Sequence, residues 1–269
     1  MGKTLGIISI KGGVGKTTVA ASLAADLANH YKQRVLLIDG NHTTPHIGTH
    51  MNVGMPNKTL QDVLSGKSNS LAAVHKRFGV DVIPGDLIYS RKTNPFKLKN
   101  AIQKMNSNYD FVIIDSAPTL GDEAQAVLSA SDGSFIVSTA DEPTLHSSLA
   151  ATRLIEKSNG KVYGIILNKL RDKTFEFGLK DFEKATGVPV VACLPDDKNV
   201  GRALFTQIPA PVFKKNSAFS NELSKLSSSL AGQKQDVSLI RRVLGLNMKS
   251  EEVNREVLRN EFYTSIFNN

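Results

Sequence analysis

"TLGIISIKGGVGKTTVAASLAADLA", residues 4–28, is the stretch that decides the fold. It opens with a short apolar run rich in β-branched residues, continues through three closely spaced glycines, and ends in an alanine-rich segment with helical spacing. Such a pattern predicts a strand, a glycine loop and a helix in that order. A loop in this position is typical of proteins that bind phosphate groups at a helix N-terminus.

The glycine loop carries the residues that a nucleoside triphosphate requires. Without Cβ atoms at Gly12, Gly13 and Gly15, backbone N–H groups can converge on phosphate oxygens. Lys16 then lies where its ammonium reaches the β- and γ-phosphates, and the Thr17 hydroxyl lies where it can bind Mg²⁺. A glycine turn that binds nothing is the alternative, but the element order and the Lys-Thr pair favour a nucleotide site.

The loop departs from the general G-x-x-x-x-G-K-[ST] pattern at its first glycine, which is Ile10 here, and it carries an additional lysine, Lys11. In both respects it resembles the deviant Walker A motif of the MinD/ParA family of P-loop ATPases, over about residues 3–231. The resemblance implies a P-loop NTPase fold, bound ATP with Mg²⁺, and nucleotide contacts from Gly12, Gly13, Val14, Gly15, Lys16, Thr17 and Thr18.

Apolar runs alternate with helical segments along most of the chain. The runs are continuously hydrophobic, which indicates strands buried on both faces and a mostly parallel sheet of about seven or eight strands flanked by helices. The predicted strands lie near 4–10, 34–40, 80–85, 110–117, 133–140, 161–168 and 188–195, and the predicted helices near 17–30, 59–65, 95–106, 121–130, 143–158, 176–186 and 197–206.

Hydrophobicity falls in "SKLSSSLAGQKQD", so we expect one α/β ATPase domain over residues 1–233 and a C-terminal helical extension over 234–269. The first residues, "MGKTLGIIS", have no long apolar core, and no run reaches the length of a membrane span. These features favour a cytoplasmic protein. The single cysteine, Cys193, excludes an internal disulfide and a CxxC cluster site.

Two aspartates each follow a predicted buried strand: Asp39 ends "VLLID" and Asp115 ends "FVIID". Ligands of such sheets bind at the carboxyl ends of strands, and Mg²⁺ prefers a few carboxylates with substrate oxygens and water. We therefore predict Thr17, Asp39 and Asp115 as the metal-binding residues. A strand-end acid that only caps a turn is the alternative for either carboxylate.

By the family resemblance, "IIDSAP" corresponds to Walker B with switch II, and "DGNHTTPHIG" to switch I. Asp39 matches the first acid of the family's D-x-D, whereas Asn41 stands where relatives have the aspartate that orients the attacking water. Asparagine can hydrogen-bond a water but cannot accept its proton, so we expect slow hydrolysis, or help from Asp122 or a partner. The predicted catalytic residues are Lys11, Lys16, Asp39 and Asn41.

Asn168, Pro195 and Asp196 match the adenine-binding positions of the family, and they favour ATP over GTP. Asn168 ends the predicted strand "GIILN", and Pro195 with Asp196 follows the next one. The resemblance implies that the asparagine amide reads the base while the proline segment lies against the ring. An asparagine at a strand end is often only a turn former, which is the alternative.

Lys11 is redundant for phosphates that Lys16 already contacts, so its expected target is the phosphate of a facing subunit. In the family this lysine crosses a two-fold dimer and acts like an arginine finger supplied in trans. The resemblance thus implies an ATP-dependent homodimer that hydrolysis releases. A solvated lysine at the loop edge is the alternative.

Three histidines of switch I, His42, His46 and His50, recur every four residues, as metal ligands on one helix face would. Pro45 interrupts that helical register. We therefore leave two interpretations open: a transition-metal site, or a solvated loop.

The formal charge of +8 favours an anionic partner, either nucleic acid or acidic lipid. Residues 237–249 predict a short basic amphipathic helix placed like the MinD membrane-targeting tail. It is apolar at Val237, Ile240, Val243 and Leu244 and basic at Arg241, Arg242 and Lys249. The mixed charge of residues 250–269 suits lipid poorly, and both segments could instead pack on the domain or on a partner.

Three functions fit this sequence. The first is a MinD-like ATPase that dimerises on ATP and associates with the inner face of the membrane to position or regulate an unidentified partner protein. The second is a ParA-like ATPase whose dimer binds DNA nonspecifically. The third is an ATP-gated scaffold with little hydrolysis, which Asn41 suggests. The basic residues are scattered and no helix-turn-helix motif is present, which weakens the DNA interpretation.

Overall fold

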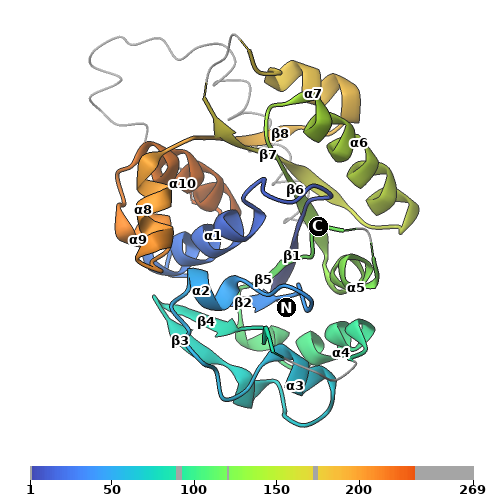
Figure 1. Cartoon of the computed structure of the whole chain (residues 1–269), viewed down its shortest axis with the longest axis vertical. Helices are drawn as coiled ribbons and strands as arrows, with labels where there is room; N and C mark the ends of the chain where they lie inside the picture. The colour runs from blue at the N-terminus through green and yellow to red at the C-terminus, as the bar shows by residue number, and fades with distance from the viewer. Residues whose placement is uncertain (1, 89–92, 120, 172–174, 234–269) are drawn as a thin grey trace.

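A computed structural model of the chain describes residues 2–88, 93–119, 121–171 and 175–233, so the predicted extension 234–269 lies outside the described residues. Its centre is an eight-stranded sheet in the order β3-β4-β2-β5-β1-β6-β7-β8 (Figure 1). This confirms the predicted α/β fold with a mostly parallel sheet. The strands are β1 Lys3–Ile8, β2 Val35–Asp39, β3 His75–Arg77, β4 Val80–Ile83, β5 Phe111–Asp115, β6 Gly133–Ser138, β7 Val162–Leu170 and β8 Val190–Pro195.

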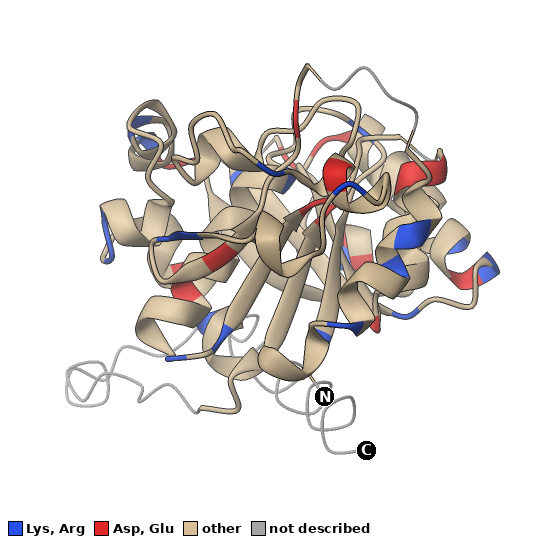
Figure 2. Cartoon of the chain, turned by 90° about the horizontal axis from the view of Figure 1, so that it is seen from below, with Lys and Arg blue, Asp and Glu red and all other residues tan. Residues whose placement is uncertain are grey.

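Helices cover both faces of the sheet. On one face lie α1, α8, α9 and α10, and on the other lie α4, α5, α6 and α7 (Figure 1). Charged residues of both signs are interspersed on the helices and loops around the sheet (Figure 2). The helices are α1 Lys16–His30, α2 Ile47–His50, α3 Leu60–Leu64, α4 Leu98–Gln103, α5 Asp122–Ala130, α6 Glu142–Lys157, α7 Leu179–Thr186, α8 Lys198–Phe205, α9 Ala210–Phe213 and α10 Ala218–Leu230, with 3₁₀ turns η1 Leu71–Ala73, η2 Pro95–Lys97 and η3 Asn106–Asn108.

The central strands are parallel, and their register aligns the carboxyl ends where the predicted site residues lie. β5 lies between β1 and β2, and every residue of β2 and β5 is buried. Asp39 of β2 is directly opposite Asp115 of β5, and Ile7 of β1 is opposite Asp115 from the other side. Three chain segments far apart in sequence therefore end at one place.

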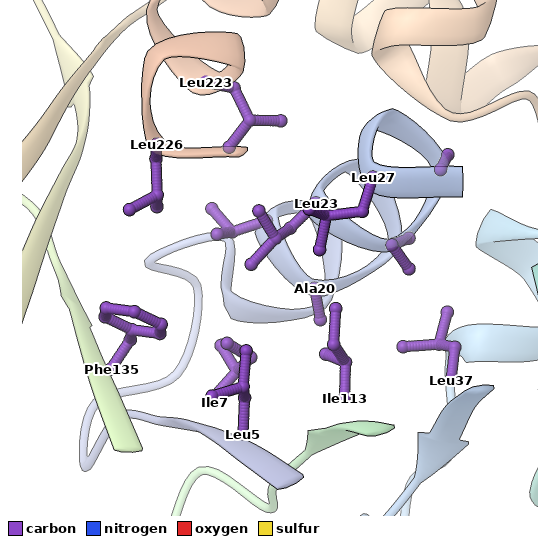
Figure 3. Packing of buried hydrophobic residues seen from close by; sticks show 14 of the residues in the cluster. Leu5, Ile7, Ala20, Leu23, Leu27, Leu37, Ile113, Phe135, Leu223 and Leu226 are labelled. Atoms are coloured by element: carbon purple, nitrogen blue, oxygen red, sulfur yellow. The ribbon is translucent and has the colours of Figure 1, made fainter. Parts of the chain in front are cut away.

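Helix α1 is the centre of one of the two hydrophobic cores. Its alanines allow close approach to the sheet, where Ala20 and Leu23 meet Ile7, Ile113 and their neighbours. Leu223 and Leu226 of α10 lie on the other side of α1 (Figure 3). The helix that follows the glycine loop is thus packed on both sides, which fixes the direction of its N-terminus.

Several elements were not predicted from the sequence: β3, the helices α2, α9 and α10, and the 3₁₀ turns η1 and η3. β3 is a short strand that pairs antiparallel with β4 at the sheet edge, and its residues are mostly exposed, so it lacks the apolar run used to recognise strands. The omission of α10 was an error, because Phe219, Leu223, Leu226 and Leu230 recur at helical spacing and are all buried. Its serines masked this pattern. The predicted helix 95–106 is divided between η2 and α4.

Within the described ranges, we find no helix with both the length and the apolar character needed to cross a lipid bilayer.

Candidate functional site

The glycine loop between β1 and α1 has the backbone that its sequence predicts. Gly13 and Gly15 have φ angles of 81° and 90°, in the left-handed region that favours glycine. Gly15 is also the N-cap of α1, so the free N–H groups of the first helical turn face the loop. A Cβ at Gly15 would lie 2.3 Å from Asn168 Nδ2, so this position requires glycine for space as well as for conformation.

Lys16 is the buried cation of the site. Its Nζ donates to Asp115 Oδ1 at 3.0 Å and to the Ser116 carbonyl, and the side chain is only 7% exposed. The adjacent Thr17 hydroxyl donates to Asp115 Oδ2 at 2.6 Å. The structure thus brings together three of the predicted residues, with both oxygens of Asp115 occupied from the first turn of α1.

Asp39 gives the site a second buried carboxylate. Its Oδ2 accepts from the Ile47 N–H at 2.8 Å and its Oδ1 from the Asn41 N–H at 3.3 Å. Burial, and then the neighbouring charge of Asp115, raises the pKa of Asp39 to about 8. Two acid side chains therefore lie near Lys16, and a divalent cation would favour the ionised form of both.

The donor set also fits Mg²⁺ chemically. The Thr17 hydroxyl in the first turn of α1 and the carboxylates of Asp39 and Asp115 at the ends of two adjacent strands are hard oxygen ligands. These are the residues that would hold the metal. A bound Mg²⁺ would offset the charge of phosphate oxygens beside Lys16.

Asn41 lies in the turn that follows β2, and its side chain organises that turn. Its Nδ2 donates to the Thr44 hydroxyl at 3.0 Å, and its Oδ1 accepts from the Thr44 N–H at 3.2 Å. The residue is buried two positions after Asp39. Its predicted effect on the attacking water stays a prediction, because these bonds describe only the turn.

Lys11 differs from Lys16 in both exposure and partner. Its side chain is 44% exposed, and its Nζ pairs with Asp141 Oδ1 at 3.3 Å instead of with the carboxylates that face Lys16. Asp141 is the N-cap of α6, where its side chain also accepts from the Thr144 N–H. The sequence did not identify Asp141, since it is 130 residues from Lys11.

Asn168 and its neighbour anchor the glycine loop from the end of β7. Asn168 is buried, and its Nδ2 donates to the Val14 carbonyl at 2.8 Å. The Lys169 Nζ donates to the Gly13 carbonyl at 2.7 Å. With these two carbonyls bonded outward, the loop can present N–H groups to an anion. Sequence reasoning missed Lys169, although it directly follows Asn168 at a strand end.

The adenine-binding residues remain predictions. Asn168 lies beside the glycine loop, where its amide is engaged with Val14. Pro195 ends β8, and Asp196 is exposed and forms an ion pair with Arg171, 2.6 Å between Oδ2 and Nε. All three lie at the carboxyl ends of β7 and β8, on the edge of the sheet that holds the loop.

The switch I histidines have separate partners. His50 Nε2 is 3.2 Å from the Thr18 hydroxyl, which links α2 to the first turn of α1. His42 is largely buried with its Nδ1 4.0 Å from Glu123 Oε1, and burial lowers the pKa of its ring. Across the described residues, no group of three or more His, Cys, Asp or Glu side chains is arranged to hold a metal ion.

Comparisons with known proteins agree with this geometry. The AAA domain family model matches residues 2–162. An uncharacterized ATP-binding protein of Methanocaldococcus jannaschii is 32% identical over 232 residues, covering 84% of this chain and 87% of that protein. The chromosome partitioning protein ParA of Caulobacter vibrioides is 28% identical over 257 residues, covering 87% of this chain and 96% of ParA. The structure of the septum site-determining protein MinD from Pyrococcus horikoshii, complexed with Mg-ADP, has a TM-score of 0.80 at 26% identity, covering 93% of this chain and all of that one.

The raised pKa of Asp39 leads to a prediction about stability without nucleotide. Between its ordinary value of 3.8 and about 8, the folded protein keeps a proton on Asp39 that the unfolded chain has lost. Stability from this group therefore falls as pH rises through that window and is constant above it. Asp39→Asn imitates the protonated acid, so its melting temperature relative to wild type should rise from pH 5 to pH 8.

Thermal unfolding in EDTA, without nucleotide, measures this difference at each pH. Mg-ATP serves as the control, since it should stabilise the wild type more than the variant. A difference between the two proteins that stays constant with pH would contradict the raised pKa.

Proposed function

The chain belongs to the MinD/ParA family of AAA-domain ATPases, and we propose that it is a MinD-like ATPase whose nucleotide state controls dimerisation and membrane association. ATP with Mg²⁺ would bind at the glycine loop and join two copies. The dimer would associate with the inner face of the membrane and position or regulate a partner protein. Hydrolysis, which we expect to be slow, would reset the cycle.

The observation that carries the proposal is the buried contact of Lys16 and Thr17 with Asp115 beneath the loop. Lys16 would transfer its hydrogen bonds from Asp115 to the β- and γ-phosphates, since both are anionic acceptors. The freed carboxylate of Asp115, with Thr17 and Asp39, would then hold Mg²⁺ directly or through water. The loop N–H groups would complete the phosphate site.

Dimerisation is supported by the contrast between the two loop lysines. Lys16 is buried and faces the nucleotide site of its own chain, whereas Lys11 is half-exposed and held by Asp141. An ion pair between exposed groups contributes little stability, so a phosphate of a facing subunit could readily replace Asp141. Lys11 would in that way make ATP part of the dimer interface.

Slow hydrolysis is supported by Asn41. Its amide donates within its own turn and has no basic lone pair that could accept a proton from water. Phosphoryl transfer depends chiefly on positioning and charge stabilisation, so the reaction would still proceed. The resulting dimer would remain intact on ATP for longer than in relatives with an aspartate at this position.

The membrane is preferred to DNA as the surface bound. The predicted amphipathic helix near 237–249, outside the described residues, combines apolar and basic positions as an interfacial helix does. Two copies in a dimer would bind much more strongly than one. In the view of Figure 2, Lys and Arg are interspersed with Asp and Glu on the helices and loops around the sheet.

The two lysines should have separable effects. Lys16→Ala should lower ATP affinity by more than about 100-fold, because it removes charge-assisted bonds to phosphate. Lys11→Ala should leave ATP affinity within about threefold but prevent ATP-driven dimerisation. Calorimetric titration and sizing chromatography with Mg-ATP measure the two properties. A Lys11→Ala protein that still dimerises would exclude the trans role, and unchanged affinity in Lys16→Ala would refute the site.

Restoring the carboxylate in switch I should accelerate hydrolysis. Asn41→Asp is expected to raise the single-turnover rate by about tenfold, which corresponds to about 1.4 kcal/mol, with little change in ATP affinity. Asn57→Asp, at an exposed position, is the matched control for the added charge. If wild type and Asn41→Asp turn over equally fast with and without vesicles, Asn41 does not limit catalysis.

Binding to the membrane should depend on which nucleotide is bound. More of the wild-type protein should sediment with phosphatidylglycerol vesicles in Mg-ATP than in Mg-ADP, because the ATP-bound dimer would carry two copies of the segment 237–249. Arg241→Glu/Arg242→Glu should weaken this binding. Plasmid DNA is tested in parallel at several salt concentrations. ATP-dependent retention on DNA with a steep salt dependence, and no vesicle binding, would reject the membrane proposal in favour of a ParA-like function.

A further inference from the structure

Helices α8 and α9 place their apolar side chains in the reverse of the usual arrangement. The small residue Ala203 of α8 is buried, and so are Ala210 and Pro211 of α9. The large residues that follow them in each helix face solvent instead: Leu204 and Phe205 end α8, and Val212 and Phe213 end α9. Phe205 is 90% exposed. Large apolar groups that gather on a surface mark an interaction site more often than an accident of composition.

The two helices form one structural unit on the outside of the domain. α9 packs on α1 and α8 packs on α9, at the outer side of the helical layer that covers this face of the sheet (Figure 1). Asp197 caps α8 by accepting from the Asn199 N–H at 2.8 Å, and Pro209 precedes α9 in a short turn. The exposed side chains therefore lie on helices that are packed against the rest of the domain.

The same short segment of the chain that carries these apolar residues is also basic. The stretch 198–216, "KNVGRALFTQIPAPVFKKN", contains four basic residues and no acid. All four are exposed, and in the described part of the chain none of them forms an ion pair: Lys198, Arg202, Lys214 and Lys215. The preceding acids are engaged elsewhere, Asp196 with Arg171 and Asp197 at the cap of α8. We call these eight residues, four apolar and four basic, the α8–α9 surface.

We propose that the α8–α9 surface is a second membrane contact, which inserts Phe205 and its apolar neighbours among anionic lipid headgroups while the four cations pair with phosphates. The charge of the surface is complementary to an anionic bilayer, and aromatic side chains with basic residues are favoured at such an interface. This inference rests on the proposed membrane association but does not depend on the tail at 237–249, since every residue of the surface lies in the described domain.

The α8–α9 surface also lies close in the sequence to residues predicted to bind the nucleotide. α8 begins three residues after Pro195, in the segment predicted to lie against adenine, and the Phe219 N–H of α10 donates to Asp197 at the start of α8. A contact made here would therefore be close in sequence to the segment predicted to bind adenine, whereas residues 237–249 come after α10 in the sequence.

The test is vesicle sedimentation of the full chain with Mg-ATP, on phosphatidylglycerol–phosphatidylcholine vesicles and on phosphatidylcholine alone. Phe205→Ser should weaken binding to the anionic vesicles by about tenfold, through loss of buried apolar area. Lys214→Glu/Lys215→Glu should weaken it at least as much. Binding to phosphatidylcholine alone should be weak throughout.

Matched controls lie on the opposite helical layer, where Phe96, Lys97 and Lys99 form an exposed aromatic and basic group at η2 and α4. Phe96→Ser, with its side chain 48% exposed in the wild type, and Lys97→Glu/Lys99→Glu should retain most of the binding. Circular dichroism and ATP titration confirm that each variant is folded, and Phe205 is exposed enough for its replacement to leave folding intact.

The outcomes separate this inference from the proposed function. Wild-type binding that both α8–α9 variants retain overturns the inference and leaves membrane association standing. Absence of wild-type binding to any vesicle rejects membrane association itself. Retention on plasmid DNA that Lys214→Glu/Lys215→Glu abolishes, without vesicle binding, assigns the surface to nucleic acid and overturns the inference. Loss of vesicle binding in the α8–α9 variants with retention in the controls supports it.

Discussion

The buried ion pair between Lys16 and Asp115 is the contact on which the candidate site depends. Neither charge can stay buried without the other, so the pair holds the first turn of α1 against the end of β5. Asp39 adds a further carboxyl group from β2 with no additional cation, and burial together with the neighbouring charge of Asp115 raises its pKa. The site is therefore prepared for a ligand that brings both a divalent cation and phosphate oxygens.

Two sets of hydrogen bonds hold the glycine loop in place. Lys16, which follows the loop, is bonded to Asp115, and Asn168 and Lys169 of β7 donate to two carbonyls of the loop. A loop with flexible glycines would lose considerable conformational entropy on ligand binding. Because two of its carbonyls are already bonded, the loop is largely ordered when the protein folds, so less conformational entropy is lost on binding. Its N–H groups remain available to an anion. Gly15 is confined by the same contacts, since Asn168 occupies the space of a Cβ.

Two lysines five residues apart serve different surfaces of the molecule. The helix start turns Lys16 inward, whereas Lys11 stays at the edge of the loop with Asp141. The C-terminal end of the domain shows a similar division, since α9 packs on α1 and α8 on α9, and both helices bury their small residues while they present large apolar ones to solvent. The side chains that remain at the surface have the proposed interactions: Lys11 with a second copy of the chain, and the α8–α9 surface with lipid.

The sequence by itself determined most of the order of elements, the mostly parallel sheet, the glycine loop between β1 and α1, and the acids at the ends of β2 and β5. These follow from local patterns: apolar runs, glycine spacing and polar residues after strands. The sequence also held the signal for α10, which its serines obscured. Only the tertiary structure decided that Lys11 meets Asp141, that Asn168 and Lys169 hold the loop, and that Phe205 is exposed. Each of these depends on residues brought together by packing across the sheet, and no local pattern encodes which distant side chain will fill the adjoining space.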